Sequence, residues 1–342
     1  MTALAGPAPL PWRRMAWVTW RHHRVALAGV ATLLGVLAVY LWVAGLQLHH
    51  AYAVATACQP ASSVACQNMM ENFDGSYSSP AQTIVALLHV VPVLIGAFAG
   101  APLLARELET GTFRYAWTLG IGRWRWAFAK LVPLAIVLAT AAGAFGVLLS
   151  WYYQPYFNDA NQNVHLSEMT PFFPGLFDLH GVAFAAWTLA AFAIGALAGM
   201  LIRRVVPAIV ATVASYTGLA CATDLLLRQR YLTPLLTSNP DVPSSAWITS
   251  QWWTKGGAFA FASPPDSLLS QFCSALPSGD FDRRPKATTL AECIAQHGYT
   301  QWTKYQPASR FWPFQWIEGG WLLALSALLI AATIWLVRRR AA

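Results

Sequence analysis

Long apolar runs alternate with shorter polar stretches along this chain. A helix that crosses a bilayer needs about 20 mostly apolar residues. Six stretches meet this requirement, and they cover residues 25–48, 84–104, 127–151, 181–202, 205–227 and 319–337. Only Arg203 and Arg204 separate the fourth stretch from the fifth, so we expect a tight helical hairpin there. The pattern predicts an all-α polytopic membrane protein with six transmembrane helices.

The composition supports a membrane protein and excludes two other classes. Charged residues make up 11% of the 342 residues, and hydrophobic residues make up 56%. A soluble globular protein carries about 25% charged residues, and a disordered chain has low hydrophobicity. The first apolar run is preceded by a basic, Trp-rich segment and is too long for the apolar region of a signal peptide. We therefore expect it to remain as a span.

The basic residues predict the orientation of the six spans. Fourteen of the 22 lysines and arginines fall in the two terminal segments and in the connections after spans two and four. The loops at 49–83 and 152–180 contain none. Basic residues favour the cytoplasmic side, so we expect both termini in the cytoplasm of a bacterial plasma membrane protein. The net charge of +8 thus reports topology, and a nucleic-acid partner is not expected.

The remaining segments predict two accessory elements. Residues 1–24 mix Trp12, Trp17 and Trp20 with arginines, which favours a cytoplasmic helix lying in the membrane interface. An ordinary flanking anchor for the first span would have similar residues. The connection at 228–318 is long for a structureless loop. We expect it to form a small extracellular cap of short helices.

Cysteine positions agree with this topology. Cys58 and Cys66 fall in the first predicted outer loop, and Cys273 and Cys293 fall in the last. Disulfides form in oxidising compartments, so we predict Cys58–Cys66 and Cys273–Cys293 as pairs. The sequence leaves the crossed pairing and free thiols open. Cys221 lies within the fifth span.

Residues 105–126 form the substantial cytoplasmic loop between spans two and three. The loop begins with Glu107 and Glu109, and Gly111 then supplies a flexible turn. A short helix held between two spans could receive a push from a soluble partner. The alternative is a solvated loop whose basic residues only orient the neighbouring spans, and it would contain the same residues.

This loop resembles the signature of type-2 ABC transporter permeases. The resemblance rests on Glu109-Thr110-Gly111-Thr112, on Thr118-Leu119-Gly120-Ile121-Gly122-Arg123 and on Lys130-Leu131. Segments 20–24 and 311–340 resemble actinobacterial members of the family, so the likeness extends over nearly the whole chain. Gly120 and Gly122 depart from the pattern, because the family usually has Pro and Ser there.

The resemblance implies a function and a set of partners. Residues 105–118 would form a coupling helix that docks on a separate ATP-binding subunit, where ATP and Mg²⁺ bind. The implied contact residues are Glu107, Glu109, Gly111, Thr112 and Arg123. Two permeases would pair, as a homodimer or with a paralogous permease. The chain contains no G-x-x-x-x-G-K-[ST] motif, so it is not expected to hydrolyse ATP itself.

The expected function is export of a hydrophobic or amphipathic small molecule, such as a drug, antibiotic, lipid or peptide. The alternative is a non-transporting membrane enzyme or sensor on the same scaffold. Neither the transported molecule nor the strict direction of transport follows from the residues. No catalytic residue is predicted in the chain.

Four ionisable residues near the predicted outer ends of spans are candidates for a substrate path: His89, His180, Asp224 and Glu318. Ionisable groups within spans are functional candidates by default. We single out His89 and Asp224 for the exit of such a path, although polar groups anchored at the interface would look alike. The pairs His22-His23 and His49-His50 are poor chelates because adjacent helical residues diverge, so no metal is expected.

Overall fold

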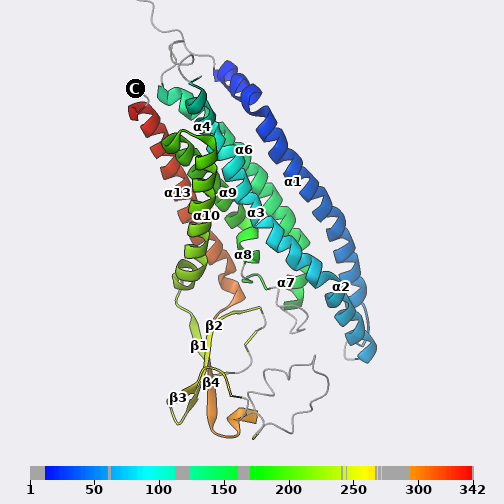
Figure 1. Ribbon diagram of the computed structural model, residues 1–342. Helices are drawn as coiled ribbons and strands as arrows, with labels where there is room; N and C mark the ends of the chain where they lie inside the picture. Colours follow the sequence, from blue (N-terminus) through cyan, green and yellow to red (C-terminus); the bar gives the residue numbers. More distant parts are fainter. Residues whose placement is uncertain are drawn as a thin grey trace, which may run out of the picture.

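The computed structural model describes residues 12–60, 63–111, 123–160, 170–173, 175–239, 242–243, 245–265, 268, 271 and 293–340. Within these ranges the side chains of residues 12–27, 123, 158–160 and 340 are outside the description. Long helices form an elongated bundle, and a small sheet projects from one end of it (Figure 1). The first helix of the chain begins, and the last helix ends, at the opposite end of the bundle (Figure 1). We call these the sheet end and the terminal end.

In the described part of the chain, six helical segments are long and apolar enough to cross a membrane, which confirms the predicted polytopic fold. They cover Ala28–Thr56, Val64–Thr110, Trp124–Tyr152, Gly181–Ile202, Val205–Arg230 and Ala308–Arg339. The elements that build them are α1 (Trp12–Thr56), α2 (Val64–Leu88), α3 (Val90–Ile95), the π-helical η1 (Gly96–Gly100), α4 (Ala101–Thr110), α6 (Arg123–Tyr152), α9 (Gly181–Ile202), α10 (Val205–Ala222), the π-helical η2 (Thr223–Leu227), the 3₁₀ turns η3 (Arg228–Arg230) and η4 (Ala308–Arg310), and α13 (Phe311–Arg340). Two short helices, α7 (Gln154–Ala160) and α8 (Leu176–Leu179), lie near the sheet end.

Helix α1 is longer than expected in both directions. It runs without interruption for 45 residues, or about 68 Å at 1.5 Å per residue. The structure therefore does not separate an interfacial helix at 1–24 from the first span, and residues 1–11 lie outside the described part. No proline or glycine follows Pro11 until Gly29, so nothing in the sequence breaks the helix there.

The predicted outer loop at 49–83 is also mostly helical. Helix α1 extends to Thr56 and α2 begins at Val64, so only residues 57–63 connect the two helices. The predicted disulfide between Cys58 and Cys66 closes this connection, with a Cα–Cα distance of 5.5 Å. Cys293 is disulfide-bonded as well, and its predicted partner, Cys273, lies outside the described residues. Cys221 is free and exposed on α10.

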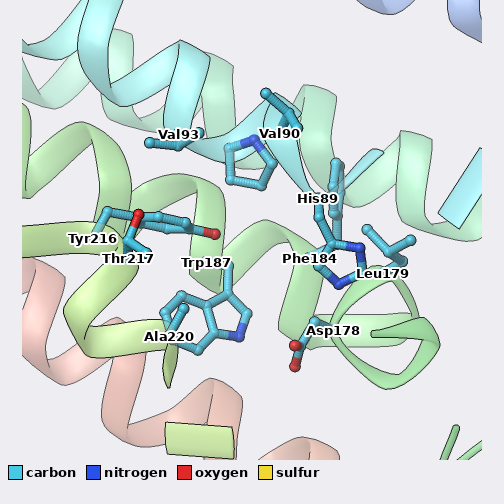
Figure 2. Close-up of a pocket in the computed structure, with 11 residues that line it drawn as sticks. His89, Val90, Val93, Asp178, Leu179, Phe184, Trp187, Tyr216, Thr217 and Ala220 are labelled. Carbon is cyan, nitrogen blue, oxygen red and sulfur yellow. The ribbon is translucent and has the colours of Figure 1, made fainter. Parts of the chain in front are cut away.

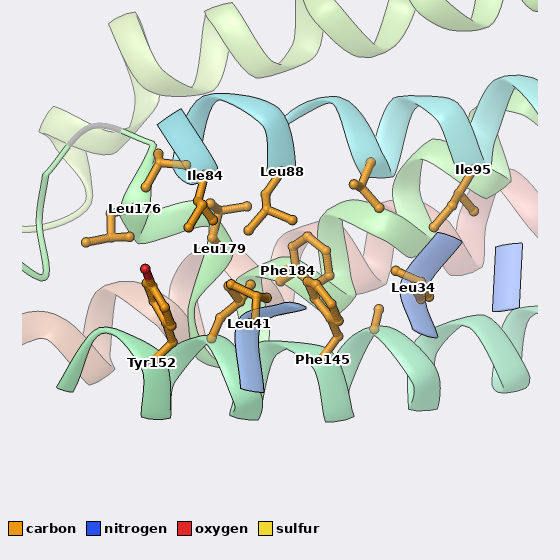
Figure 3. Close-up of a cluster of buried hydrophobic side chains, with 14 of the residues drawn as sticks. Leu34, Leu41, Ile84, Leu88, Ile95, Phe145, Tyr152, Leu176, Leu179 and Phe184 are labelled. Atoms are coloured by element: carbon orange, nitrogen blue, oxygen red, sulfur yellow. The ribbon is translucent and has the colours of Figure 1, made fainter. Parts of the chain in front are cut away.

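Helix α9 lies at the centre of the bundle and contacts α3, α4, α6, α10 and α13. The main apolar cluster packs between α1, α2, α3, α6 and α9 (Figure 3). Leu41, Leu88 and Phe184 are among its most deeply buried members. By contrast, less than a quarter of the apolar stretch of α1, of α10 and of α13 is buried, as expected for surfaces that face lipid or another protein.

Four glycines bring two helices into backbone contact. Gly96 and Gly100 pack against the backbone of α9, and Gly195 and Gly199 of α9 pack against η1 and the start of α4; small residues four apart allow this close approach. A Cβ atom on Gly195 would lie 2.3 Å from the Gly96 carbonyl oxygen. A Cβ atom on Gly199 would lie equally close, 2.3 Å, to the Ala101 carbonyl oxygen. Any side chain at these positions would force α9 away from η1 and α4.

The segment beyond α10 forms a sheet where short helices were expected. Strands β1 (Leu235–Thr237), β2 (Trp247–Lys255), β3 (Ala258–Phe261) and β4 (Tyr299–Gln306) pair antiparallel in the order β1-β4-β2-β3. The prediction of a helical cap is wrong for these residues. The sequence held the relevant signal: β2 and β4 are rich in Trp, Tyr and Thr, and Gly256-Gly257 supplies the positive φ angles that a tight hairpin turn requires.

Aromatic packing attaches the sheet to the bundle. Phe172, Phe177 and Phe314 form a buried cluster, against which Trp247 of β2 and Phe311 pack. Phe172 stacks on Trp247 with ring centroids 5.9 Å apart. The sheet therefore rests on α8 and the start of α13, next to the charged residues described below.

Candidate functional site

At the terminal end, an ion pair joins the two helices that flank residues 111–122. Glu107 near the end of α4 accepts a hydrogen bond from Lys130 in the second turn of α6. Lys130 also lies 4.4 Å from the centroid of the Trp126 ring, and Trp126 is buried. Because both charged side chains are mostly shielded from solvent, their attraction is weakly screened. The two ends of the loop are thus held together.

Glu109 connects the same loop to a third helix. One of its carboxylate oxygens accepts a hydrogen bond from the backbone N–H of Val205, at 3.1 Å. Val205 is the first residue of α10, and Arg204, at the N-cap position, provides no side-chain cap of its own. A carboxylate at a helix N-terminus satisfies a free N–H and interacts favourably with the helix dipole. We call Glu107, Glu109 and Lys130 the loop base.

The structure describes some of the predicted coupling residues and not others. Residues 105–110 of the predicted coupling helix are the end of α4, which is continuous with the second span. Gly111 ends that helix in the left-handed conformation, with φ of 72°. Thr112 lies outside the described residues, and Arg123 begins α6 but its side chain is not described. The predicted tight turn at Arg203-Arg204 is confirmed, and Arg203 adopts a positive φ of 58° there.

At the sheet end, one arginine contacts three carboxylates. Arg228 donates hydrogen bonds to Asp178, to Asp224 at 2.7 Å and to both oxygens of Glu318 at 2.9 and 3.1 Å. The guanidinium also lies 4.6 Å from the centroid of the Phe177 ring. Arg228 is 4% exposed and Glu318 is fully buried. We call these four charged residues the Arg228 cluster.

Indole and phenol groups complete the contacts of Glu318. Trp187 of α9 donates to one oxygen at 3.0 Å, and the Tyr231 hydroxyl donates to the other at 3.3 Å. Trp321 in turn donates to Tyr231 at 2.9 Å. The Arg228 cluster and its neighbours thus join α8, α9, η2, η3 and α13 through hydrogen bonds. Such buried carboxylates persist only when paired and fully hydrogen-bonded.

The Arg228 cluster carries an excess of negative charge. It contains three carboxyl groups and one guanidinium, and no other lysine or arginine among the described residues forms an ion pair with these carboxyl groups. Burial raises the pKa of the Asp178 carboxyl above its ordinary value, the charges of Glu318 and Asp224 raise it further, and Arg228 opposes the rise. The carboxyl therefore binds a proton more readily than a free aspartate, first because burial disfavours its charged form and then because two further carboxyl groups lie nearby.

A cavity of about 270 Å³ lies beside the cluster, between α3, α8, α9 and α10 (Figure 2). Its wall is mainly apolar and includes Pro92, Phe184 and Trp187, together with Asp178 from the cluster. Val90 and Thr217, which also line the cavity, are exposed, so it opens at the protein surface.

Two polar groups at the cavity lack partners among the described residues. The Nδ1 atom of His89 lies 2.7 Å from the Val85 carbonyl oxygen, which requires a proton on Nδ1 and makes Nε2 of the neutral ring an acceptor. His89 Nε2 is buried and has no hydrogen-bond partner in this part of the structure. Tyr216 is 9% exposed, and its hydroxyl points into the cavity with no hydrogen bond to a described residue.

The predicted substrate-path residues lie at the sheet end, but they occupy different positions relative to the cavity. His89 lines the cavity, whereas Asp224 does not; Asp224 is linked through Arg228 to Asp178, which does line it. His180 is away from the cavity wall and lies between the Tyr153 and Phe157 rings, and burial lowers its pKa to about 4. The sequence did not single out Asp178, Arg228 or Tyr216. Arg228 had one local signal, an aspartate four residues earlier at the end of an apolar run.

Comparison with known proteins gives one match. A family model described as ABC-2 membrane transporter related matches residues 31–228, which is more than half of the chain. The matched region contains the loop base and ends at Arg228, before the sheet and α13. No curated protein and no solved structure matches the chain.

Proposed function

Because the chain belongs to the ABC-2 membrane transporter related family, we propose that it is the permease subunit of an ATP-driven exporter. A separate subunit binds and hydrolyses ATP, and two permeases assemble with two such subunits. Both termini then lie in the cytoplasm and the sheet lies outside the cell. The cargo is a hydrophobic or amphipathic small molecule.

The loop base is the observation that supports this function best. A subunit that docks on residues 105–123 would push on a segment whose two ends are joined by the Glu107–Lys130 ion pair. Glu109 extends the connection to the first turn of α10. A displacement of the loop would therefore move α4, α6 and α10 together, which is what coupling of ATP hydrolysis to transport requires.

The sheet end supports the same assignment. In the proposed orientation, the Cys58–Cys66 disulfide faces the oxidising exterior. The basic residues Arg203 and Arg204 lie at the other end of α9 and α10, on the cytoplasmic side. The apolar surfaces of α1, α10 and α13 leave room for a second copy of the chain beside the lipid.

Purification from the native host tests the assembly. We expect the tagged full-length chain to isolate a Walker-A-containing protein in equal amount, and the complex to hydrolyse ATP. Mass spectrometry identifies the partner and a phosphate-release assay measures hydrolysis. A chain that is active alone in membranes, with no ATP-binding protein attached, would instead favour a membrane enzyme or sensor.

Substitution of Glu109 tests the coupling role. Glu109→Lys removes the acceptor for the Val205 N–H and places a positive charge at the helix N-terminus. We expect transport per ATP hydrolysed to fall by about tenfold, in line with the loss of a charge-assisted hydrogen bond. The measurement is substrate uptake into inverted vesicles, with ATP hydrolysis recorded in parallel.

Glu109→Gln is the matched variant, because its amide oxygen can still accept the hydrogen bond. It should retain most of the coupling, and both variants should insert into the membrane at normal levels. Equal coupling in the Lys variant and the wild-type protein would contradict the role of Glu109.

A further inference from the structure

We propose that the cavity between α3, α8, α9 and α10 binds the ammonium group of an amphipathic organic cation. This inference rests on the proposed export function and names the class of its substrate. The binding groups are Asp178, His89 and Tyr216, with Trp187 forming part of the wall. The apolar part of the ligand extends past the rim at Val90 and Thr217.

The charge of the neighbouring groups selects a cation. Three carboxyl groups surround Arg228, so one guanidinium balances up to three negative charges. Asp178 is the member of this set that lines the cavity, and its side chain is 22% exposed. An ammonium ion beside Asp178 would supply the missing positive charge, whereas an anion would add to the repulsion.

The hydrogen-bonding groups select a donor. Nδ1 of His89 donates to the Val85 carbonyl oxygen, which leaves Nε2 as the acceptor of a ring that carries one proton. The Asp178 carboxylate is an acceptor as well, and the Tyr216 hydroxyl can act as one. A protonated amine presents up to three N–H donors to these groups. His89 Nε2, which is buried without a partner among the described residues, would then be satisfied by the ligand.

The wall of the cavity suits an organic cation better than a metal ion. The Trp187 and Tyr216 rings meet edge to face, with centroids 5.5 Å apart. Aromatic faces attract organic cations and remain compatible with their alkyl groups. The Trp187 N–H is already bound to Glu318, which fixes the orientation of this ring. Pro92 and Phe184 add apolar surface that an ion surrounded by water would not contact.

The size of the cavity limits what it encloses. A volume of about 270 Å³ is slightly below the usual range for drug-sized ligands, about 300–1,000 Å³. The cavity can therefore enclose a charged group and a few attached carbons, while the rest of the molecule lies outside. An amphipathic amine with its chain along exposed apolar surface fits these limits.

Binding of octylammonium and octanoate to the full-length chain in lipid nanodiscs tests the proposal. The two probes share chain length and differ in charge, and empty nanodiscs correct for partition into lipid. We expect the chain to bind octylammonium at least about tenfold more tightly than octanoate, as a charge-assisted hydrogen bond implies. Octyltrimethylammonium, which has the charge but no N–H donor, should bind less tightly than octylammonium.

Two variants test the residues. Asp178→Asn should lower octylammonium affinity by about tenfold, and Tyr216→Phe should lower it by about threefold, because the second change removes only a neutral hydrogen-bonding group. Asp74→Asn on α2 is the matched control, since Asp74 does not line the cavity. This variant should bind octylammonium as tightly as the wild-type chain does. Equal binding of octanoate and octylammonium would overturn the proposal. Unchanged octylammonium affinity in both Asp178→Asn and Tyr216→Phe would also overturn it.

This assay separates the inference from the proposed function, because it needs no ATP-binding subunit. A chain that assembles with an ATPase but shows no preference for cations would refute only the substrate class. A chain that prefers octylammonium through Asp178 but never associates with an ATPase would refute the exporter and leave the cation site in place.

Discussion

Replacing Arg228 with methionine is expected to lower the free energy of unfolding by about 3–5 kcal/mol, the usual cost of breaking a buried ion pair. Arg228 is 4% exposed and bonds with three carboxyl groups, one of which, Glu318, is fully buried. Methionine fills a similar space but donates no hydrogen bond. The carboxylates would then face one another without a cation. Thermal unfolding of the purified chain in detergent, followed by size-exclusion chromatography, measures the loss.

Two further variants show whether the lost charge of Arg228 causes the lower stability. Arg230→Met changes the same residue type two positions away, at an exposed site, and should leave stability nearly unchanged. Adding Glu318→Gln to Arg228→Met removes one uncompensated charge and should restore part of the lost stability. If Arg228→Met and Arg230→Met unfolded at the same temperature, the Arg228 cluster would have no structural role.

The second large effect is expected at the contact between α9 and η1. Gly195→Ala should lower the free energy of unfolding by about 1–3 kcal/mol, the usual cost of forcing extra atoms into a packed core. The new Cβ atom would meet the Gly96 carbonyl oxygen at 2.3 Å and the Ala101 nitrogen at 2.8 Å. Both are backbone atoms, so neither can rotate away as a flexible side chain would.

Gly143→Ala on α6 is the matched control and should raise the free energy of unfolding. A Cβ atom there meets nothing within 4 Å. Alanine also favours the helix over glycine by about 1 kcal/mol. The same unfolding measurement compares the two variants. A Gly195→Ala chain at least as stable as the Gly143→Ala chain would disprove the close backbone contact.

Some features of this protein follow from sequence because they depend on short stretches of chain. The fourth span, Gly181–Ile202, is bounded as the apolar run predicts. The Arg203-Arg204 turn is equally local, and Cys58 and Cys66 are only eight residues apart. The strands β2 and β4 are also local features, because their Trp, Tyr and Thr content and the Gly256-Gly257 pair after β2 can be read from short stretches of sequence.

Helix ends were predicted less well, for a physical reason. Hydropathy marks the part of a helix that suits lipid, and α1 and α2 continue beyond it as polar helix. These polar ends of α1 and α2 pack against each other through aromatic residues, such as Tyr52 and Phe73. Such contacts join residues on different helices, so the apolar pattern of either segment alone does not reveal them.

By itself, the sequence determined the six spans, the Arg203-Arg204 turn and the loop that resembles a coupling segment, and it favoured the Cys58–Cys66 disulfide without excluding other pairings. Only the tertiary structure decided which polar groups meet. Arg228 lies 50 residues from Asp178 and 90 from Glu318, yet it bonds to both. Hydrophobic patterning places each residue at a depth along its helix, but the partner across the bundle depends on how the helices pack. The cavity beside Asp178, and the acceptors that favour a cation, exist only because that packing brings α3, α8, α9 and α10 together.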